Sequence, residues 1–554
     1  MSYVIAEPQM LASVAAEIEG IGSAFSAANA AAAAPTSGIA AAAGDEVSVA
    51  VADLFGAVGK DYQSVVARFE AFHHQFRQTL ASAGIAYAET EAAIATSLGL
   101  AGPGAPNPAL PAATIPPFTA NQVSYFIGGT GTPIPSPSFV SRANNLYVRS
   151  VGSLVALFTP EQLYPLTGVK SLPLNTSVQE GVTILDNTLY STIHGQGQTV
   201  TVFGISQSAI ISSLEMQNLA NGTSLFGANP PNVNQLNFVL AGNEVNPNGG
   251  LLSRFPNLSL PALGLDFYPG MNANTPYHVA NYTLEYDGFA DFPRYPINLL
   301  ADLNAVAGIV FVHPTYLDLT TTQVNSAIQL PTSPGYAGNT TYYMIHTADL
   351  PLLKPLDAIP VIGKPLVDLI QPDLKVLVNL GYGPDPSLGY STSYADVPTP
   401  FGLFPDANPG TVFNALAAGT GQGIHDFSLD MQQIASQPTA VVPQFSLPTA
   451  PGPTTTPASL PSPQQVFDAV NRIVSTDYAV VLPTADIGYS LATELPFYDS
   501  ELFLSQLAQG NLINAIGYPI AADMGLGTVA GGVEALTLLS AVTSNVKDIQ
   551  SLIP

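Results

Sequence analysis

The hydrophobic pattern of this chain changes its period near residue 97, and this change constrains the fold more than any other feature. Before it, apolar residues recur in steps of three and four, which places them on one face of an α-helix. Two series show this spacing, separated by a Pro-Thr-Ser-Gly break at 35–38: Leu11, Val14, Ile18, Ile21 and Phe25, then Leu54, Val58, Tyr62, Val65, Phe69, Phe72, Phe76 and Leu80. Residues 1–96 are therefore predicted to form an all-α helical hairpin, whose apolar stripes call for a helical partner.

Beyond a Pro-, Gly- and Ala-rich linker at 97–119, short β-rich runs alternate with helical stretches. The predicted strands are Val123–Ile127, Thr199–Phe203, Leu236–Leu240 and Tyr282–Tyr286, and the predicted helices between them include Val178–Thr192 and Gln207–Leu219. This alternation predicts an α/β domain over 120–390 with a mainly parallel sheet covered by helices. An extension and Pro-rich linker at 391–463 and a mostly helical C-terminal region at 464–554 complete the chain.

The charge balance excludes several classes of partner. Only 9% of the 554 residues are charged, and the formal net charge is −26. Nucleic acids and anionic membranes are poor partners, because too little positive charge is present to displace their counterions. The sequence has no Cys, so it forms no disulfide or thiolate metal site, and the N-terminus lacks the charged and apolar regions of a signal peptide. An apolar partner such as a lipid remains compatible with this composition.

One short segment carries the main chemical signal. Gly204-Ile205-Ser206-Gln207-Ser208 follows an apolar β-branched strand and opens a helical stretch. A tight strand-to-helix turn holds a nucleophilic Ser clear of the sheet, and it needs small residues two positions on either side of that Ser. Gly204 meets this need, and Ser208 replaces the usual Gly. Ser206 is the predicted nucleophile.

Such a nucleophile needs two backbone N–H groups that bind the oxyanion. Gln207, directly after the Ser, supplies the first. The Gly128-Gly129-Thr130-Gly131-Thr132-Pro133 loop after the first predicted strand supplies the second, from Thr130 or Gly131. The loop lacks the spacing of a phosphate-binding motif.

The general base should be a His that comes late in the chain, after a strand. The sequence has seven His. Five of them lie outside the expected order or lack a leading strand: His73, His74, His194, His278 and His425. His313 and His346 remain, and each follows an apolar, strand-like run, so the pattern alone does not choose between them.

An Asp that orients the base is expected between the nucleophile and the His. Asp287 comes directly after the predicted Tyr282–Tyr286 strand, and Asp291 lies four residues further on. Both are candidates on this evidence.

The N-terminal region resembles the PE domain of mycobacteria, from Met1-Ser2-Tyr3-Val4-Ile5 through Phe72-His73-His74-Gln75-Phe76. The Pro-Glu pair of that family appears here as Pro8-Gln9. The resemblance implies a PPE-family helical partner for residues 1–96. Tyr87-Ala88-Glu89-Thr90-Glu91 is similar to the Tyr-x-x-x-Asp/Glu signal of type VII secretion, with Tyr87 and Glu91 as its defining residues. It implies a secreted protein of the cell envelope or cell surface.

The section from about 120 to 390 resembles the PE-PPE domain, a serine α/β hydrolase related to cutinases. The matching features are the Gly128–Pro133 loop, the Gly-x-Ser-x-Ser segment, the Tyr286–Pro293 stretch and His313-x-x-Tyr316. The resemblance maps the catalytic residues onto Ser206, Asp287 and His313, with Asp291 and His346 as alternatives. It implies an esterase or lipase acting on an acyl ester.

Two other functions remain compatible with the same residues. The acyl group could pass to a sugar hydroxyl, which would make the protein an acyltransferase of envelope glycolipids. Alternatively, the chain could be a non-catalytic surface interaction protein. No metal or nucleotide cofactor is expected, because the His residues lack zinc-site spacing and no phosphate loop is present.

Overall fold

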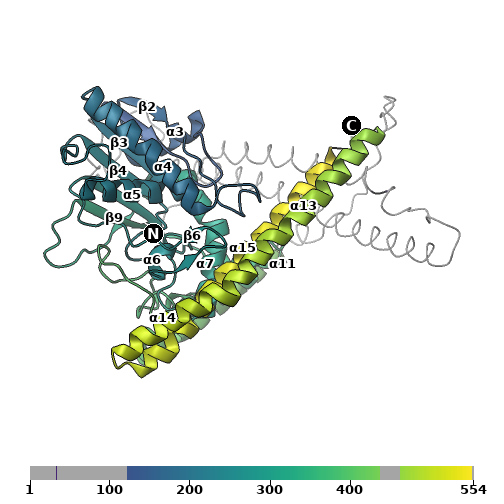
Figure 1. The fold of residues 1–554 in the computed structure, drawn as a ribbon. Helices are drawn as coiled ribbons and strands as arrows, with labels where there is room; N and C mark the ends of the chain where they lie inside the picture. The colour runs from purple at the N-terminus through teal and green to yellow at the C-terminus, as the bar shows by residue number, and fades with distance from the viewer. Residues whose placement is uncertain (1–32, 34–120, 437–461, 552–554) are drawn as a thin grey trace, which may run out of the picture. The chain divides into compact units, whose positions relative to one another are not determined.

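The computed structural model describes residue 33, residues 121–436 and residues 462–551 (Figure 1). The predicted N-terminal hairpin, the linker at 97–119 and the secretion motif with Tyr87 and Glu91 lie outside the described residues. Chain contacts divide the molecule into two units, and residues 112–432 and 475–543 form the larger one. That larger unit contains every candidate catalytic residue.

A seven-stranded sheet organises the larger unit, in the order β2-β1-β3-β4-β7-β9-β8. All pairs are parallel except β8–β9, which is antiparallel at one edge. The strands are β1 (Val123–Phe126), β2 (Ser153–Ala156), β3 (Val200–Ile205), β4 (Leu236–Ala241), β7 (His278–Leu284), β8 (Ile328–Gln329) and β9 (Thr340–Ile345). A separate two-stranded hairpin consists of β5 (Ser259–Leu260) and β6 (Leu265–Asp266). The prediction of a mainly parallel sheet is confirmed.

Both faces of the sheet are covered by helices, as a parallel sheet requires. Along β3, Val200 and Val202 face a core that includes α4 (Leu174–Leu189) and α5 (Gln207–Asn221). Phe203 and Ile205 face the opposite core, whose helical part includes α3 (Pro137–Ala143) and α8 (Thr321–Asn325). Because both sides of β3 are buried, the strand is a continuous apolar run in the sequence rather than an alternating one.

The remaining elements of the α/β body are helices and helical turns. They are the π-helical turns Asn144–Val148 and Tyr190–Gly195, α6 (Leu251–Arg254), α7 (Leu299–Phe311), the 3-10 turns His313–Asp318 and Pro351–Leu353, α9 (Lys354–Asp357) and α10 (Gly363–Asn379). Helix α7 starts at a cap in which the side chain of Asn298 accepts a hydrogen bond from the Ala301 N–H.

Two predicted strands differ from the structure. The strand expected at Tyr282–Tyr286 begins earlier, at His278, and ends at Leu284, and Tyr286 has a positive φ of 66°. The apolar run before His313 is the end of helix α7, so the strand-like interpretation of Val310–Val312 is wrong. Nearly every residue of Leu299–Phe311 is apolar, and a short run of this kind shows no period that separates a buried helix from a buried strand.

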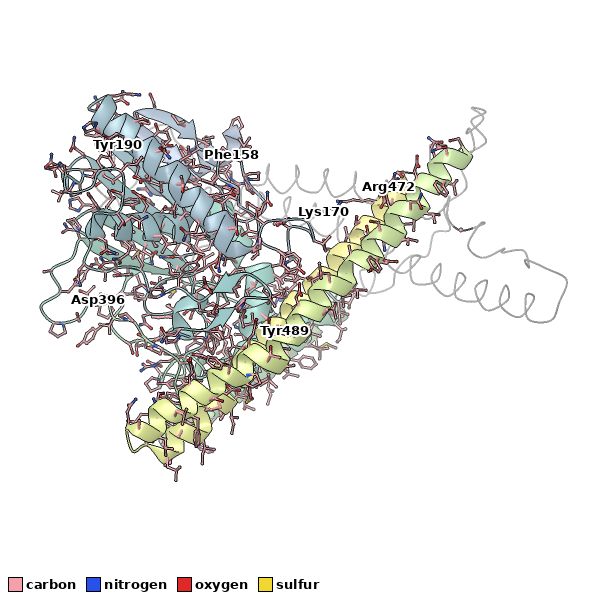
Figure 2. All side chains as sticks on the ribbon, viewed as in Figure 1. Phe158, Lys170, Tyr190, Asp396, Arg472 and Tyr489 are labelled. Atoms are coloured by element: carbon pink, nitrogen blue, oxygen red, sulfur yellow. The ribbon has the colours of Figure 1, made fainter. Side chains whose placement is uncertain are left out.

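Long helices form the C-terminal region, as predicted: α11 (Pro409–Ser436), α13 (Pro463–Tyr489), α14 (Leu495–Ala508) and α15 (Leu512–Gln550), with a π-helical turn at Ser490–Glu494. Helix α11 occupies part of the segment expected to be extension and linker. By length and composition, α15 could cross a membrane, with a mean hydropathy of 1.4 in its most apolar window. However, Ala521, Ala522 and Leu526 of this helix belong to the core of the α/β body. Large apolar side chains are exposed along these helices, including Tyr489, labelled in Figure 2.

Gly204 in β3 should not tolerate a side chain. A Cβ there would lie 2.7 Å from the Ser208 carbonyl oxygen and 2.8 Å from Ser212 Oγ. We expect Gly204→Ala to destabilise the protein by roughly 1–3 kcal/mol, the usual cost of overpacking a core, measured as the shift in the urea unfolding curve. The control is Gly195→Ala, where an added Cβ meets no atom within 4 Å. Equal stability of the two variants would contradict this packing argument.

Candidate active site

The candidate site lies where the sheet reverses its strand order. From β1 the chain moves outward to β2, and it returns on the other side of β1 to form β3. In open α/β sheets, ligands bind outside the carboxyl ends of the strands at such a switch point. The loop that follows β1 and the turn that follows β3 meet here, since a Cβ on Gly129 would lie 2.9 Å from Ser206 Cβ.

Ser206 occupies a strained turn between β3 and α5. Its backbone has φ 56° and ψ −127°, a conformation that non-glycine residues rarely adopt and that costs about 1–3 kcal/mol. The turn lifts the Ser206 side chain off the end of β3, at the N-terminus of α5. This is the strand, turn and helix geometry expected of a nucleophilic Ser.

Ser208, the departure from the usual Gly, has a structural role in the same turn. Its side chain is fully buried, and its Oγ accepts a hydrogen bond from the Ile205 N–H at 2.7 Å. Oγ also lies 3.0 Å from the Ile205 carbonyl oxygen and 3.3 Å from that of Ile127 in the neighbouring chain segment. The hydroxyl therefore satisfies backbone groups that the sharp turn would leave unpaired.

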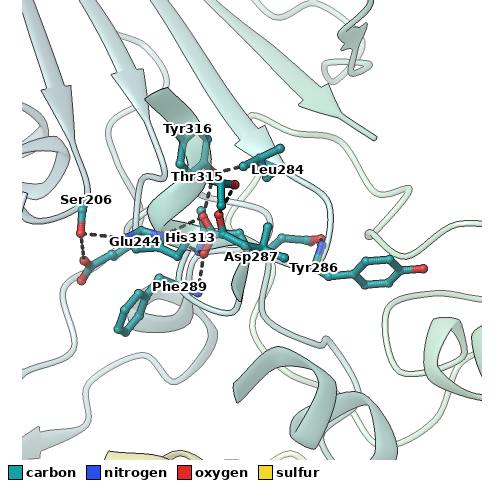
Figure 3. A network of polar contacts seen from close by, with 12 residues as sticks. Ser206, Glu244, Leu284, Tyr286, Asp287, Phe289, His313, Thr315 and Tyr316 are labelled. Atoms are coloured by element: carbon teal, nitrogen blue, oxygen red, sulfur yellow. Dashed lines mark hydrogen bonds and ion pairs between the residues drawn. The ribbon is translucent and has the colours of Figure 1, made fainter. Parts of the chain in front are cut away.

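His313 lies next to Ser206, although it comes from a different segment of the chain. Its Nε2 lies 2.8 Å from Ser206 Oγ, and it starts the 3-10 turn that follows helix α7 (Figure 3). Gly242, with φ 59°, makes room for the ring, because a Cβ there would lie 2.9 Å from His313 Cε1. The His313 ring also packs against Phe289 in a T-shaped contact, at 4.9 Å between ring centroids.

Asp287 orients His313 from the loop after β7. Both of its carboxylate oxygens lie 2.9 Å from His313 Nδ1. Tyr316 donates its hydroxyl to Oδ2 at 2.7 Å, and the N–H groups of Phe289 and Ala290 donate to Oδ1 at 3.0 and 3.3 Å. Burial is the largest single influence on the pKa of His313 and lowers it, but the charge and hydrogen bond of Asp287, together with the charge of Glu244, outweigh burial and raise that pKa above its ordinary value.

The two alternative residues lie elsewhere. His346 follows β9, as expected, but its Nδ1 pairs with Glu285 and its side chain is mostly exposed. Asp291 accepts a hydrogen bond from the Tyr286 N–H at 3.1 Å and so shapes the loop that presents Asp287. Burial raises the pKa of Asp291 well above its ordinary value. Neither residue is hydrogen-bonded to His313 or to Ser206.

Of the predicted oxyanion donors, Gly131 already donates its N–H elsewhere, which leaves the N–H groups of Gln207 and Thr130 as the candidates. The Gly131 N–H donates to the Glu161 carbonyl oxygen at 2.7 Å, so the prediction for Gly131 is wrong. Gln207 is the first residue of α5, and the first N–H groups of a helix have no partner within it. The Gln207 side chain also fixes the β1 loop, because its Nε2 donates to Thr130 Oγ1 at 3.0 Å and to the Gln162 carbonyl oxygen at 3.0 Å.

Sequence reasoning missed Glu244, which is the second polar partner of Ser206. It lies three residues after β4, is 6% exposed, and brings its Oε1 within 3.1 Å of Ser206 Oγ. A single Glu in a loop carries no motif, and only the order of the strands places it beside the nucleophile. The one available signal was its position directly beyond the carboxyl end of a predicted central strand.

Taken together, the site can activate a hydroxyl for attack on a carbonyl carbon. It contains a hydroxyl on a sharp turn, an imidazole within hydrogen-bond distance of it, a buried carboxylate behind that imidazole, and N–H donors beside the hydroxyl. Among the described residues, no cluster of three or more His, Asp or Glu is placed to hold a metal ion.

Replacing Asp287 by Asn should lower the pKa of His313 below its wild-type value. The charge that stabilises the protonated ring is then gone, while burial of the ring continues to favour the neutral form. An NMR titration of the imidazole measures this directly. Asp291→Asn is the control, because Asp291 contacts the Tyr286 N–H instead. A His313 pKa that is the same in wild type and Asp287→Asn would show that the carboxylate does not act on the ring.

Known proteins resemble this chain in both of its predicted regions. The PE family matches residues 4–94, and the PE-PPE domain matches residues 153–383. The chain is 44% identical over 452 residues to the PE family protein PE3 of Mycobacterium tuberculosis (strain ATCC 25618 / H37Rv), which covers 81% of this chain and 91% of that protein. It is 43% identical over 408 residues to Esterase PE16 of the same strain, covering 73% of each.

A third relative, the PPE family protein PPE28 of that strain, is 44% identical over 454 residues, which cover 78% of this chain and 68% of that protein. The similarity to PE3, PE16 and PPE28 extends far beyond the N-terminal 94 residues. It therefore includes the α/β region in which the candidate site lies. The chain belongs to the PE family and carries a PE-PPE domain.

Proposed function

We propose that this protein is a serine esterase that hydrolyses acyl esters through Ser206, His313 and Asp287. The observation that carries the proposal is the continuous hydrogen-bonded path from Ser206 Oγ through His313 to Asp287, on a strained turn at the end of a central strand. The similarity to Esterase PE16 supports the same reaction class.

In the proposed reaction, His313 takes the Ser206 proton as Oγ attacks the ester carbonyl carbon. The carbonyl oxygen becomes an oxyanion that the N–H groups of Gln207 and Thr130 bind. His313 then gives the proton to the departing alcohol, which leaves an acyl group on Ser206. Water attacks this acyl-enzyme with His313 again as the base, and the products are a carboxylic acid and the free Ser206 hydroxyl.

The charge around the site favours a neutral ester. Asp287 and Glu244 lie within the hydrogen-bonded network. Glu161 lies close enough to Glu244 that the charge of Glu244 raises the pKa of Glu161. No Lys or Arg is hydrogen-bonded to the described residues Ser206, His313, Asp287 and Glu244, so a carboxylate or phosphate at the scissile bond would find no cation among these contacts. Uncharged acyl esters, including lipid esters, fit this electrostatic environment and the low charge content of the whole chain.

Removal of the Ser206 hydroxyl should abolish hydrolysis. We expect Ser206→Ala to reduce kcat for a p-nitrophenyl ester on the order of 10³- to 10⁶-fold, as removal of a triad nucleophile does, and to lose labelling by a fluorophosphonate. Ser213→Ala is the control, since Ser213 is buried in the same helix with its Oγ on the Ala209 carbonyl oxygen. Full activity of Ser206→Ala would overturn the assignment. Folded wild type that shows neither hydrolysis nor labelling would favour the non-catalytic function.

The acceptor of the acyl group separates an esterase from an acyltransferase. With a trehalose ester as both donor and acceptor, we expect free fatty acid as the main product, detected by mass spectrometry. A trehalose diester that accumulates in place of free acid, and only with active Ser206, would instead show acyl transfer to a sugar hydroxyl. Ser206→Ala serves as the blank for both products.

We also infer that the PE-family region directs the protein out of the cell and pairs it with a PPE-family helical partner. The family match over residues 4–94 supports this inference. Export through type VII secretion, by way of Tyr87 and Glu91, and placement at the cell envelope or surface remain predictions from the sequence.

A further inference from the structure

Ser206 has two polar partners, although its hydroxyl carries only one proton. Its Oγ lies 2.8 Å from His313 Nε2 and 3.1 Å from Glu244 Oε1 (Figure 3). Ser206 is 8% exposed and Glu244 is 6% exposed, so water does not readily replace either contact. Both contacts can be good hydrogen bonds only if another group supplies a second proton.

The orientation of His313 identifies the group that must supply this proton. Its Nδ1 faces the carboxylate of Asp287, so the ring proton of the neutral imidazole lies there. Nε2 is then an acceptor, and the Ser206 hydroxyl donates to it. The remaining contact with Glu244 is a hydrogen bond only when Glu244 is a carboxylic acid that donates to Oγ.

The backbone around Glu244 fixes its position. The Leu252 N–H donates to the Glu244 carbonyl oxygen at 3.1 Å, and a Cβ on Gly250 would lie 2.4 Å from the same oxygen. Glu244 therefore lies in a closely packed loop, directly beyond the end of β4. Its side chain is held next to the nucleophile rather than free to turn towards solvent.

The groups that interact with Glu244 come from several elements. They are Ser206, His313, Asp287, Glu161 in the loop after β2, and Tyr268 after β6. Burial raises the pKa of Glu244 to about 7, His313 and the hydrogen bond with Ser206 act in the opposite direction, and Asp287 raises it further. Burial likewise raises the pKa of Glu161 to about 8, and Glu244 adds to that effect. No Lys or Arg is among the described groups that act on Glu244.

We propose that Glu244 is a proton-dependent gate on Ser206, active as a carboxylic acid and inhibitory as a carboxylate. The acid donates to Oγ and leaves the Ser206 hydroxyl directed at His313. The carboxylate accepts that hydroxyl instead, which breaks the contact between nucleophile and base, and it places a negative charge beside the oxyanion that forms during attack. The proposal rests on the esterase function proposed above.

The gate gives a defined pH dependence. Activity rises with pH as His313 loses its proton, at a pKa that Asp287 and Glu244 together raise above the ordinary value. Activity then falls as pH rises through about 7, where Glu244 loses its proton. Because the two groups interact, the two apparent pKa values of the resulting bell-shaped profile belong to the pair. Without an ionisable group at position 244, only the rising limb should remain.

The test is the pH profile of kcat/KM for wild type and for Glu244→Gln, whose amide donates like the acid but cannot ionise. We expect wild-type kcat/KM to fall about tenfold per pH unit on the alkaline side, and to be on the order of 30- to 50-fold below its maximum two units above the Glu244 pKa. The Glu244→Gln profile should stay flat there. Glu244→Ala should also lose the alkaline limb, with a lower plateau because Oγ loses its second partner. Glu180→Gln, on the exposed side of α4, removes the same charge away from the site and should keep the bell shape.

The rate at which a fluorophosphonate labels Ser206 provides a second readout that needs no substrate. Wild type that folds but shows neither labelling nor hydrolysis at any pH would overturn the esterase function, and the gate with it. Labelling confined to Ser206, but with an alkaline limb that persists in both Glu244→Gln and Glu244→Ala, would overturn the gate alone. Loss of that limb in both variants, with wild-type behaviour in Glu180→Gln, supports the gate.

Discussion

The buried carboxylate of Asp287 is the constraint on which the geometry of the site depends. A charge without solvent contact is tolerated only when hydrogen-bond donors surround it. Here the donors come from its own loop, through Phe289 and Ala290, and from the segment after helix α7, through His313 and Tyr316. Satisfying this one group therefore brings together the end of β7 and the end of α7, and the imidazole reaches Ser206 as a consequence.

Ser206 is surrounded by more acidic groups than its reaction requires. A serine hydrolase needs one carboxylate behind its base, and this site adds Glu244 beside the nucleophile and Glu161 close to Glu244. Three ionised carboxylates at such short range would repel one another and the oxyanion. Burial favours the neutral forms of Glu161 and Glu244, whereas the hydrogen-bond donors gather around Asp287. Because all three groups are buried, the donors around Asp287 are what distinguish it from the two Glu residues.

The sequence predicts residues that belong to a local motif, and it does not predict residues that come together only through the pairing of strands. Ser206 follows an apolar strand directly, so local pattern and turn chemistry indicate it. The same reasoning left Asp287 and Asp291 open, and the family resemblance favoured Asp287. His313 follows a helix rather than a strand, and only its family resemblance distinguished it from His346. Glu244 had no motif at all, because its proximity to Ser206 comes from the pairing of β3 with β4.

The oxyanion donors show a further limit of local reasoning. The sequence pattern predicts the Gly-rich loop after β1 beside Ser206, and a Cβ on Gly129 would indeed meet that residue. Which N–H groups remain free depends on a distant segment, in which the Glu161 carbonyl oxygen accepts a hydrogen bond from the Gly131 N–H.

The strained backbone at Ser206 is also maintained by other segments of the chain. Ser208 satisfies polar backbone groups beneath the turn, and the absence of side chains at Gly204 and Gly129 lets helix and loop approach the strand closely enough to hold it. The strain is therefore supported by contacts from three chain segments, and relaxation of the turn would break all of them together.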